Sequence, residues 1–229
     1  MKYENNTRCE IKLYQMDCME LLKQMPDKHF ELAIVDPPYG IKRDNGFDGS
    51  CGFGGLGKPI ARKKYNGKWD EATPEKEYFE ELLRVSQNQI IWGGNFFTDK
   101  LYQNNHWIFW DKINTMPTFG DGELAWTSFK RNSVKQVTIQ YNGLLGKEFE
   151  RIHPTQKPVV LYKWLLQNYA KKGDKILDTH LGSMSSVIAC YDEKFDITGT
   201  ELDPDYFRAE IERIEIHKTN KNIISNDLF

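Results

Sequence analysis

The most constraining feature of this sequence is a short apolar run, residues 32–35, that leads directly into Asp36-Pro37-Pro38-Tyr39 and then a glycine. An apolar run of this length, bounded by prolines and glycine, predicts a buried parallel strand. Proline lacks the N–H group that a sheet ladder needs, so the chain must leave the sheet directly after Asp36. A carboxylate and an aromatic ring are therefore predicted at the carboxyl end of a strand, where ligands bind in open α/β sheets.

An acid and an aromatic ring on a stiff turn suit the methylation of an exocyclic amine on a base. Such an amine is a poor nucleophile because its lone pair is delocalised into the ring. Hydrogen bonds from its N–H groups to Asp36 and to the Pro37 carbonyl would let it pyramidalise towards a methyl donor. Tyr39 would stack on a base rotated out of the helix. Taken alone, the motif equally fits an aspartate that caps a turn and a tyrosine that packs beside it, so the rest of the chain must decide.

Composition limits the class of protein. The chain has 229 residues and a net charge of −2, enough for one α/β domain with a full core. No apolar run approaches membrane-spanning length, and the N-terminus starts no secretory signal. The four cysteines show neither disulfide nor zinc spacing. We therefore expect a cytoplasmic protein without a metal site.

Two segments are basic although the whole chain is slightly acidic. Residues 41–68 hold seven basic and two acidic residues, and residues 129–157 hold six and two. The first segment is rich in glycine and has no periodicity, which is typical of a functional loop. A local basic patch predicts contacts with a phosphate backbone, and two solvated basic loops are the alternative. The candidate DNA contacts are Lys42, Arg43, Arg62, Lys63, Lys64, Lys130 and Arg131.

The remaining segments alternate between strand and helix patterns, which predicts a parallel sheet. Strands are expected at residues 11–14, 89–92, 106–110, 175–178 and 195–200. Helices are expected at 18–25, from Thr73-Pro74 to 86, from Pro158 to 172, at 185–193 and from 203 onwards. Residues 123–129 and 134–141 are expected to pair as an antiparallel hairpin. Neither repeats nor an interdomain linker are present.

In this order the motifs resemble a DNA adenine-N6 methyltransferase of the permuted, beta-type arrangement, with the catalytic turn first and the methyl-donor segment, residues 153–203, second. The resemblance runs from residue 11 to 214 and includes residues 106–112 and 123–128. It implies a Rossmann-like S-adenosylmethionine-dependent methyltransferase fold: α/β, with a mostly parallel sheet, an antiparallel hairpin and helices on both faces. It also implies a single domain, 1–229. Within it, the catalytic half covers about 10–128, DNA-contact insertions about 41–70 and 130–152, and the cofactor half about 153–218.

The turn between the strand ending at Asp178 and the next helix contains Leu181, Gly182 and Ser183. Small residues there let backbone approach a ligand, and the helix N-terminus offers free N–H groups. This turn is expected to hold the methionine end of S-adenosylmethionine, with Asp178 accepting a hydrogen bond from its ammonium. Glu201, at the end of the neighbouring strand, is expected to bind the ribose hydroxyls.

Three further cofactor residues are expected. Asp17 would reach the adenine amine, and Gln156 with Lys157 resembles the family segment that closes over the methionine part, where Lys157 would pair with its carboxylate. As alternatives, Asp178 could cap the following helix, Glu201 could be a solvated strand end, and Lys157 could be a surface lysine. His180 and Met184 stand where the family usually has phenylalanine and a second glycine, which puts cofactor affinity in doubt; His180 is expected to be a satisfied core histidine.

Several alternatives stay open. An N4-cytosine or RNA-base methyltransferase could use the same turn, although aspartate at position 36 favours adenine and the permuted order favours DNA by resemblance. A DNA-binding relative that has lost cofactor binding is also compatible. The resemblance implies a stand-alone modification enzyme of a restriction-modification type, in which a homodimer could share the double-stranded DNA. The polar C-terminal tail, residues 225–229, resembles sliding-clamp-binding peptides, with packing or fraying as its alternative.

Overall fold

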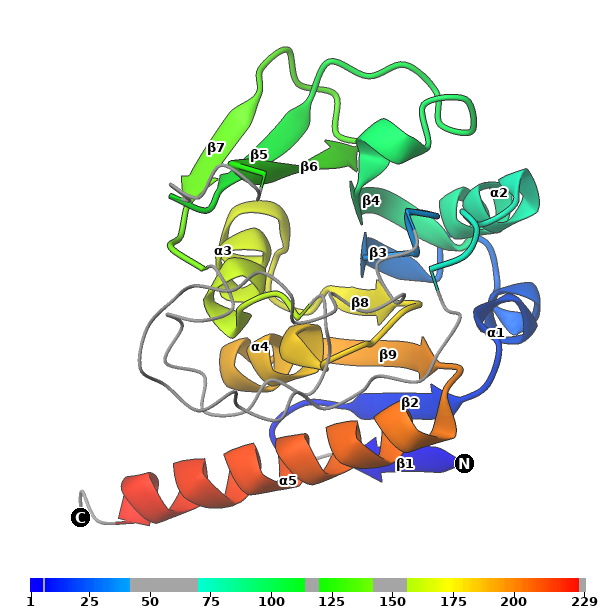
Figure 1. Cartoon of the computed structure of the whole chain (residues 1–229). Coiled ribbons are helices and arrows are strands. Elements are labelled where there is room, and N and C mark those ends of the chain that lie inside the picture. The colour runs from blue at the N-terminus through cyan, green and yellow to red at the C-terminus, as the bar shows by residue number, and fades with distance from the viewer. Residues whose placement is uncertain (6, 42–69, 114–119, 142–155, 227–229) are drawn as a thin grey trace, which may run out of the picture.

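The computed structural model describes residues 1–5, 7–41, 70–113, 120–141 and 156–226. Its central feature is a sheet of nine strands in the order β1-β2-β9-β8-β3-β4-β6-β5-β7 (Figure 1). The strands are β1 (Lys2–Asn5), β2 (Ile11–Gln15), β3 (Phe30–Val35), β4 (Ser86–Trp92), β5 (Trp107–Asp111), β6 (Gly122–Thr127), β7 (Lys135–Thr138), β8 (Lys175–Asp178) and β9 (Asp196–Glu201). The helices are α1 (Cys18–Gln24), α2 (Lys76–Val85), α3 (Val159–Tyr169), α4 (Ser185–Glu193) and α5 (Pro204–Asn226), with a 3₁₀ turn η1 (Gly94–Phe96).

The five strands β2, β9, β8, β3 and β4 are parallel, and β1 and β6 add antiparallel neighbours at their two sides. Strand β3 lies inside this parallel core and has covered faces on both sides. Side chains alternate along a strand, so Leu32 and Ile34 join the core layer under α3, α4 and α5, while Ala33 and Val35 join the layer under α1 and α2. The predicted α/β architecture, mostly parallel with helices on both faces, is confirmed.

The topology brings two strand ends together. On one side of the sheet's middle, β8 is followed outwards by β9 and β2. On the other side, β3 is followed outwards by β4. Strands β8 and β3 are neighbours at this reversal, with Leu32 paired to Ile176. Ligands bind in such sheets outside the carboxyl ends of the strands, where the strand order reverses. Asp36, directly after β3, and Asp178, the last residue of β8, therefore lie at the same edge.

Some predicted pairings and boundaries are wrong. Strands β6 and β7 do not form a hairpin: β6 pairs antiparallel with β5, and β7 pairs parallel with the other side of β5. Helix α2 begins at Lys76 and not at Thr73-Pro74, because Lys100 Nζ binds the Thr73 hydroxyl and the Pro74 carbonyl and the segment is held outside the helix.

Two other helices also differ from the prediction. Helix α3 ends at Tyr169, before Lys171, whose N–H group is bound by Asp174. The tail is shorter than expected, since α5 continues to Asn226. No helix in the described residues has the length and apolar character needed to span a membrane.

Candidate active site

The turn after β3 is held by a side chain from a distant segment. The backbone N–H groups of Tyr39 and Gly40 both donate to Asp70 Oδ1, at 2.8 Å each, and Asp70 is only 1% exposed. The Tyr39 hydroxyl donates to Asp36 Oδ1 at 2.6 Å. The prolines stop the sheet ladder and Asp70 then fixes the direction of the chain, so the turn is rigid before any ligand arrives.

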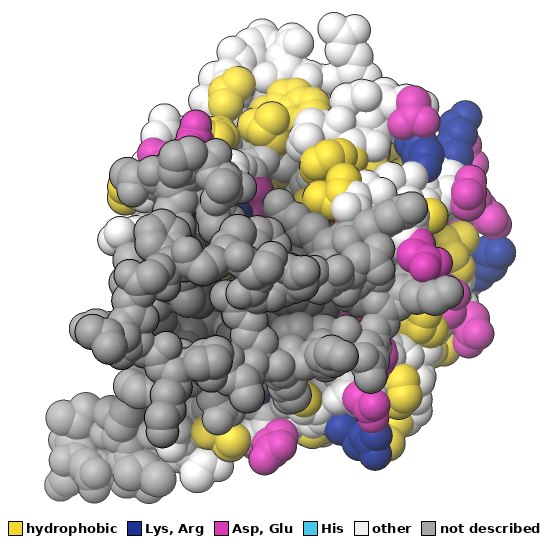
Figure 2. All heavy atoms as spheres, in the orientation of Figure 1, with side chains coloured by type: hydrophobic (Ala, Val, Ile, Leu, Met, Phe, Trp, Pro, Cys, Tyr) yellow, Lys and Arg dark blue, Asp and Glu magenta, His cyan; other side chains and the backbone are white. Residues whose placement is uncertain are grey.

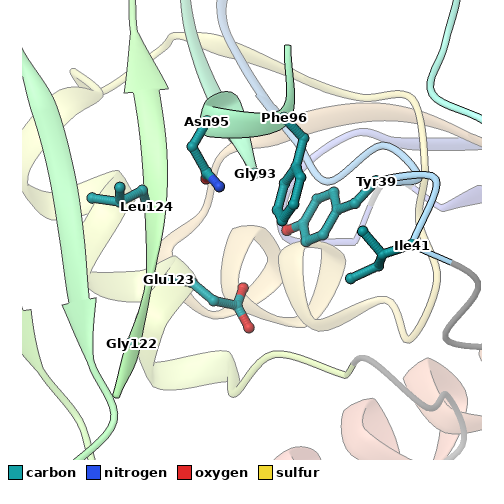
Figure 3. Close-up of a pocket in the computed structure, with 8 residues that line it drawn as sticks. All are labelled: Tyr39, Ile41, Gly93, Asn95, Phe96, Gly122, Glu123 and Leu124. Carbon is teal, nitrogen blue, oxygen red and sulfur yellow. The ribbon is translucent and has the colours of Figure 1, made fainter. Parts of the chain in front are cut away.

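Tyr39 forms one wall of a pocket of about 170 Å³ (Figure 3). Its ring stacks on Phe96, with centroids 5.0 Å apart, and Phe96 is partly exposed. Gly93 is left-handed (φ 68°), and a Cβ placed on it would lie 2.1 Å from Tyr39 Cε1, so only glycine fits there. The side chains of Asn95 and Glu123 point into the space that faces the rings. The pocket therefore combines stacking surfaces with a few polar groups, as small-molecule sites do.

Lys157 lies beside the predicted catalytic carboxylate. Its side chain is 3% exposed, and its Nζ pairs with Asp36 Oδ2 and lies 3.2 Å from Glu123 Oε2. Burial alone would lower the pKa of Lys157, but the two carboxylates raise it. Burial alone would raise the pKa of Glu123, but Lys157 and Lys112 hold it at about 2. Lys157 and Glu123 are therefore charged at neutral pH, and Lys157 is not the surface lysine of the alternative interpretation.

The second half of the site begins at the end of β8. Asp178 is buried, and its two oxygens accept hydrogen bonds from the His180 N–H group at 3.1 Å and from the Ser186 hydroxyl at 2.6 Å. Burial raises the pKa of Asp178 to about 7. At the end of β9, Glu201 accepts from the N–H groups of Gly182 and Asp203, at 3.1 and 3.0 Å. Burial also raises the pKa of Glu201.

The turn between β8 and α4 takes the shape predicted for it, with an unusual residue at its end. Gly182 is left-handed (φ 53°), and so is Met184 (φ 55°), which caps the N-terminus of α4. Arg213 of α5 donates to the Ser183 carbonyl and, at 3.2 Å, to the Ser185 hydroxyl. The Met184 side chain is completely buried within the core layer of α3, α4 and α5. Packing therefore offsets the strain of a left-handed methionine where glycine is usual.

The other predicted cofactor residues are dispersed around this edge. Asp17 is exposed and caps α1, where its Oδ1 accepts from the Met19 N–H group at 2.7 Å. Gln156, Leu181 and Ser183 are buried. His180 binds the Thr179 hydroxyl through Nδ1 at 2.9 Å, and burial lowers its pKa to about 4, so it is neutral and satisfied.

Of the predicted DNA contacts, only Lys130 and Arg131 belong to the described residues. Both are exposed, and the Arg131 guanidinium lies over the ring of Tyr169, 5.2 Å from its centroid. Lys42, Arg43, Arg62, Lys63 and Lys64 lie outside the described residues. On the face shown in Figure 2, the visible Lys and Arg side chains over α1 and α2 lie next to acidic ones, as in the Lys23–Glu77 pair.

A family model described as DNA methylase (N6_N4_Mtase) matches residues 91–212, more than half of the chain. The protein belongs to this DNA methylase family. The prediction of a DNA methyltransferase is therefore confirmed. The matched region contains the end of β4 with the following turn, Glu123, Lys157, Asp178 and Glu201. It begins after the catalytic turn and after Asp17 and Asp70.

Individual relatives support the same family. The Type II methyltransferase M2.MboI of Moraxella bovis is 25% identical over 91% of this chain and 86% of its own length. The crystal structure of an M1.HpyAVI–SAM complex has a TM-score of 0.60 at 18% identity, covering 89% of this chain and 98% of that one. PvuII DNA methyltransferase, named as cytosine-N4-specific, has a TM-score of 0.57 at 15% identity, covering 88% and 85%. These structures confirm the methyltransferase fold.

Sequence reasoning missed four residues of the site: Asp70, Gly93, Asn95 and Glu123. Asp70 stands at the end of the predicted insertion of about 41–70, where no strand or helix pattern singles it out. The glycine and asparagine directly follow the buried run of β4, so they stand at the carboxyl end of a strand beside β3. That position was the available signal. Glu123 alternates with Ala125 and Thr127, which are fully buried, so it marks an acid on a covered strand face.

Proposed function

We propose that the protein transfers a methyl group from S-adenosylmethionine to the N6 amine of an adenine rotated out of double-stranded DNA. The single observation that carries this proposal is the position of the Asp36 turn. It lies beside a pocket with an aromatic wall and at the same sheet edge as the carboxylates of Asp178, which is buried, and Glu201, which is half-buried. One strand end would thus hold the base and its neighbours the methyl donor.

Residues of the catalytic turn can position the target base and supply hydrogen-bond acceptors for its amine. Asp36 Oδ1 and Oδ2 each keep lone pairs beyond those used by the Tyr39 hydroxyl and Lys157, so the carboxylate can accept an N–H group of the target amine. Among the described residues the Pro37 carbonyl has no strand partner, so it can accept the second N–H group. Two acceptors fixed in advance favour the pyramidal amine over the planar one, which is electrostatic preorganisation. Tyr39 and Phe96 offer the surfaces on which a base can stack.

The chemistry of the second half fits a cationic cofactor. In the described part of the chain, Asp178 and Glu201 accept hydrogen bonds only from backbone N–H groups and the Ser186 hydroxyl, all of them neutral. Two carboxylates with raised pKa values, one of them buried and the other half-buried, favour a ligand that brings positive charge. S-adenosylmethionine carries an ammonium and a sulfonium, and when bound it supplies an activated methyl group. We propose that Asp178 accepts from the ammonium, Glu201 from the ribose hydroxyls and Asp17 from the adenine amine, with Leu181, Gly182, Ser183 and Gln156 around them.

Adenine is proposed over cytosine because the catalytic motif begins with aspartate. The alternative, N4 of cytosine, presents the same kind of exocyclic amine to the same turn. It is retained because a structural neighbour is named as cytosine-N4-specific. The two products differ in the base that carries the methyl group, so one assay separates them.

Contact with DNA is proposed for the basic residues of 41–68 and for Lys130 and Arg131, which are exposed beyond β6. We also propose that the catalytic half (about 10–128) and the cofactor half (about 153–218) form one domain in the cytoplasm. A homodimer and docking of the C-terminal tail to a sliding clamp are secondary proposals. Leu228 and Phe229 of that tail lie outside the described residues.

The test is methyl transfer to unmethylated genomic DNA with labelled S-adenosylmethionine, followed by nucleoside analysis of the product. N6-methyladenine is expected, and N4-methylcytosine would establish the alternative. Cofactor binding is measured in parallel by calorimetry. Binding of DNA without cofactor binding or methyl transfer would instead identify a catalytically inactive DNA-binding relative.

A further inference from the structure

Four charged side chains of alternating sign form a connected row beneath the base pocket. Lys112, directly after β5, pairs with Glu123 Oε1; Glu123 Oε2 lies 3.2 Å from Lys157 Nζ; and Lys157 pairs with Asp36 Oδ2. The exposed fractions of the four side chains lie between 3% and 20%. The row thus links the β5–β6 hairpin to the catalytic turn through groups largely removed from water, where charges interact strongly.

The ammonium of Lys157 has close polar contacts within this row. It has three N–H donors. Asp36 Oδ2 and the Tyr39 hydroxyl, the latter at 3.3 Å, accept hydrogen bonds from it, and Glu123 Oε2 forms an ion pair with it at 3.2 Å. The ammonium also lies 5.4 Å from the centroid of the Trp92 ring, which closes another side. These contacts orient it towards the catalytic carboxylate.

We propose that Lys157 and Glu123 are positioning residues that fix the Asp36 carboxylate for the target amine, an inference that rests on the proposed function. Lys157 holds Asp36 Oδ2 while the Tyr39 hydroxyl holds Oδ1, so both oxygens have fixed directions. Glu123 in turn holds Lys157. In this role Lys157 serves the reacting base, and not the cofactor carboxylate to which the family resemblance assigns it.

The sign of Glu123 has its own consequence. As the nitrogen forms its bond to the methyl carbon, the methyl–sulfur bond of S-adenosylmethionine breaks and a neutral thioether leaves, so the positive charge moves to the amine nitrogen. The nitrogen becomes neutral again when one of its protons passes to water. A lysine cation alone beside that nitrogen would oppose this change. Glu123, which faces the same pocket, offsets the cation, so the row orients Asp36 without adding net positive charge.

The experiment compares Glu123→Gln and Lys157→Met with the wild type in methyl transfer to duplex DNA, at saturating and limiting cofactor. For each variant we expect kcat to fall about 10- to 100-fold, the range expected when a fixed acceptor loses its orientation. The KM and the calorimetric Kd for S-adenosylmethionine should stay within about twofold, because in the proposed role both residues act on Asp36 and neither contacts the cofactor. Glu123→Asp should recover part of the lost kcat. Glu77→Gln, which removes an exposed ion pair with Lys23, is the matched control and should keep full activity.

Each single variant leaves the charge of its partner unbalanced in a largely buried place, so it could fail to fold. The double variant Glu123→Gln/Lys157→Met removes both charges and can be measured in that case. Its loss of kcat should be clearly smaller than the product of the two single losses, since the residues act as one unit. Three outcomes would overturn the proposal: full kcat in Glu123→Gln, independent effects in the double variant, or a Lys157→Met variant that loses cofactor affinity but keeps kcat at saturation. A wild type that methylates no DNA would refute the proposed function, and this inference with it.

Discussion

Asp70 should control both the stability and the activity of the protein. Its Oδ1 accepts the N–H groups of Tyr39 and Gly40 at 2.8 Å, and the side chain is 1% exposed. A hydrogen bond to a charged group contributes about 1.5–3 kcal/mol. Since the two bonds share one oxygen, we take the combined loss in Asp70→Ala as about 3 kcal/mol. For a chain of this length, that lowers Tm by about 6–12 °C.

The same substitution should affect catalysis more than stability alone explains. Displacement of a catalytic group by about 1 Å costs roughly 100-fold in rate, and the turn carries Asp36. Asp70→Asn keeps an oxygen acceptor and should recover most of the activity. Unfolding is followed by circular dichroism, and turnover is measured well below Tm. Asp174→Ala is the control, because it removes a similar bond to the Lys171 N–H group, at 2.8 Å, away from the site. If Asp70→Ala lost stability but kept full turnover, the assignment of Asp70 to the catalytic turn would be refuted.

Four other substitutions test the site and its support. Asp36→Asn should reduce methyl transfer by at least about 100-fold while cofactor affinity stays within about twofold; activity within tenfold of wild type would contradict the catalytic assignment. Gly93→Ala should destabilise by about 2–4 kcal/mol, from left-handed strain and a clash with the tyrosine ring. In denaturant titrations, Gly173→Ala, with φ 94° and open space around it, should show only the strain. Burial raises the pKa of Glu210 in the folded protein well above its usual range. The protonated carboxyl therefore stabilises the fold fully below the pKa of the unfolded chain, and this stabilisation is lost as pH rises through the pKa of the folded protein. Glu210→Met should therefore raise Tm more at pH 8 than at pH 5, and an equal shift at both would count against a buried titrating carboxyl. Met184→Gly should relieve about 1 kcal/mol of strain but lose about 2–5 kcal/mol of core packing, so urea unfolding should show net destabilisation.

The parts of the fold that local patterns specify were predictable. Helix α4 and strand β8 agree with the prediction in both bounds, because a short apolar strand, a small-residue turn and a helix follow one another without interruption. The pairing of β7 was not predictable. Its partner β5 is separated from it by β6, and residues of similar β propensity would fit either neighbour. Pairing of that kind is decided by packing across the sheet and not by the strand sequence.

The site residues also fall into those that local sequence predicts and those that it does not. Prolines, glycines and strand ends identify Asp36, Asp178 and Glu201, since each is positioned by its own neighbours in sequence. Asp70 gives no such signal, because it lies 31 and 30 residues away in sequence from Tyr39 and Gly40, whose N–H groups it binds. Resemblance to the family predicted that Lys157 matters, but the local sequence contains nothing that distinguishes a cofactor contact from an ion pair with Asp36. That distinction depends on where two segments 121 residues apart meet.

Glu123 shows what kind of signal was nevertheless present. It shares a strand face with Ala125 and Thr127, and both of these are completely buried. A carboxylate on a covered face is costly unless a cation pairs with it, so the strand pattern alone requires a lysine or arginine from elsewhere in the chain. Lys112, only 11 residues away across the β5–β6 hairpin, supplies one partner. A second cation in the same place would be repelled by the first unless another carboxylate balanced it. Two lysines beside Glu123 leave one positive charge in excess, and the carboxylate of Asp36 balances it. Charges this far removed from water are tolerated when they are paired. The same pairing connects the pocket wall to the catalytic turn.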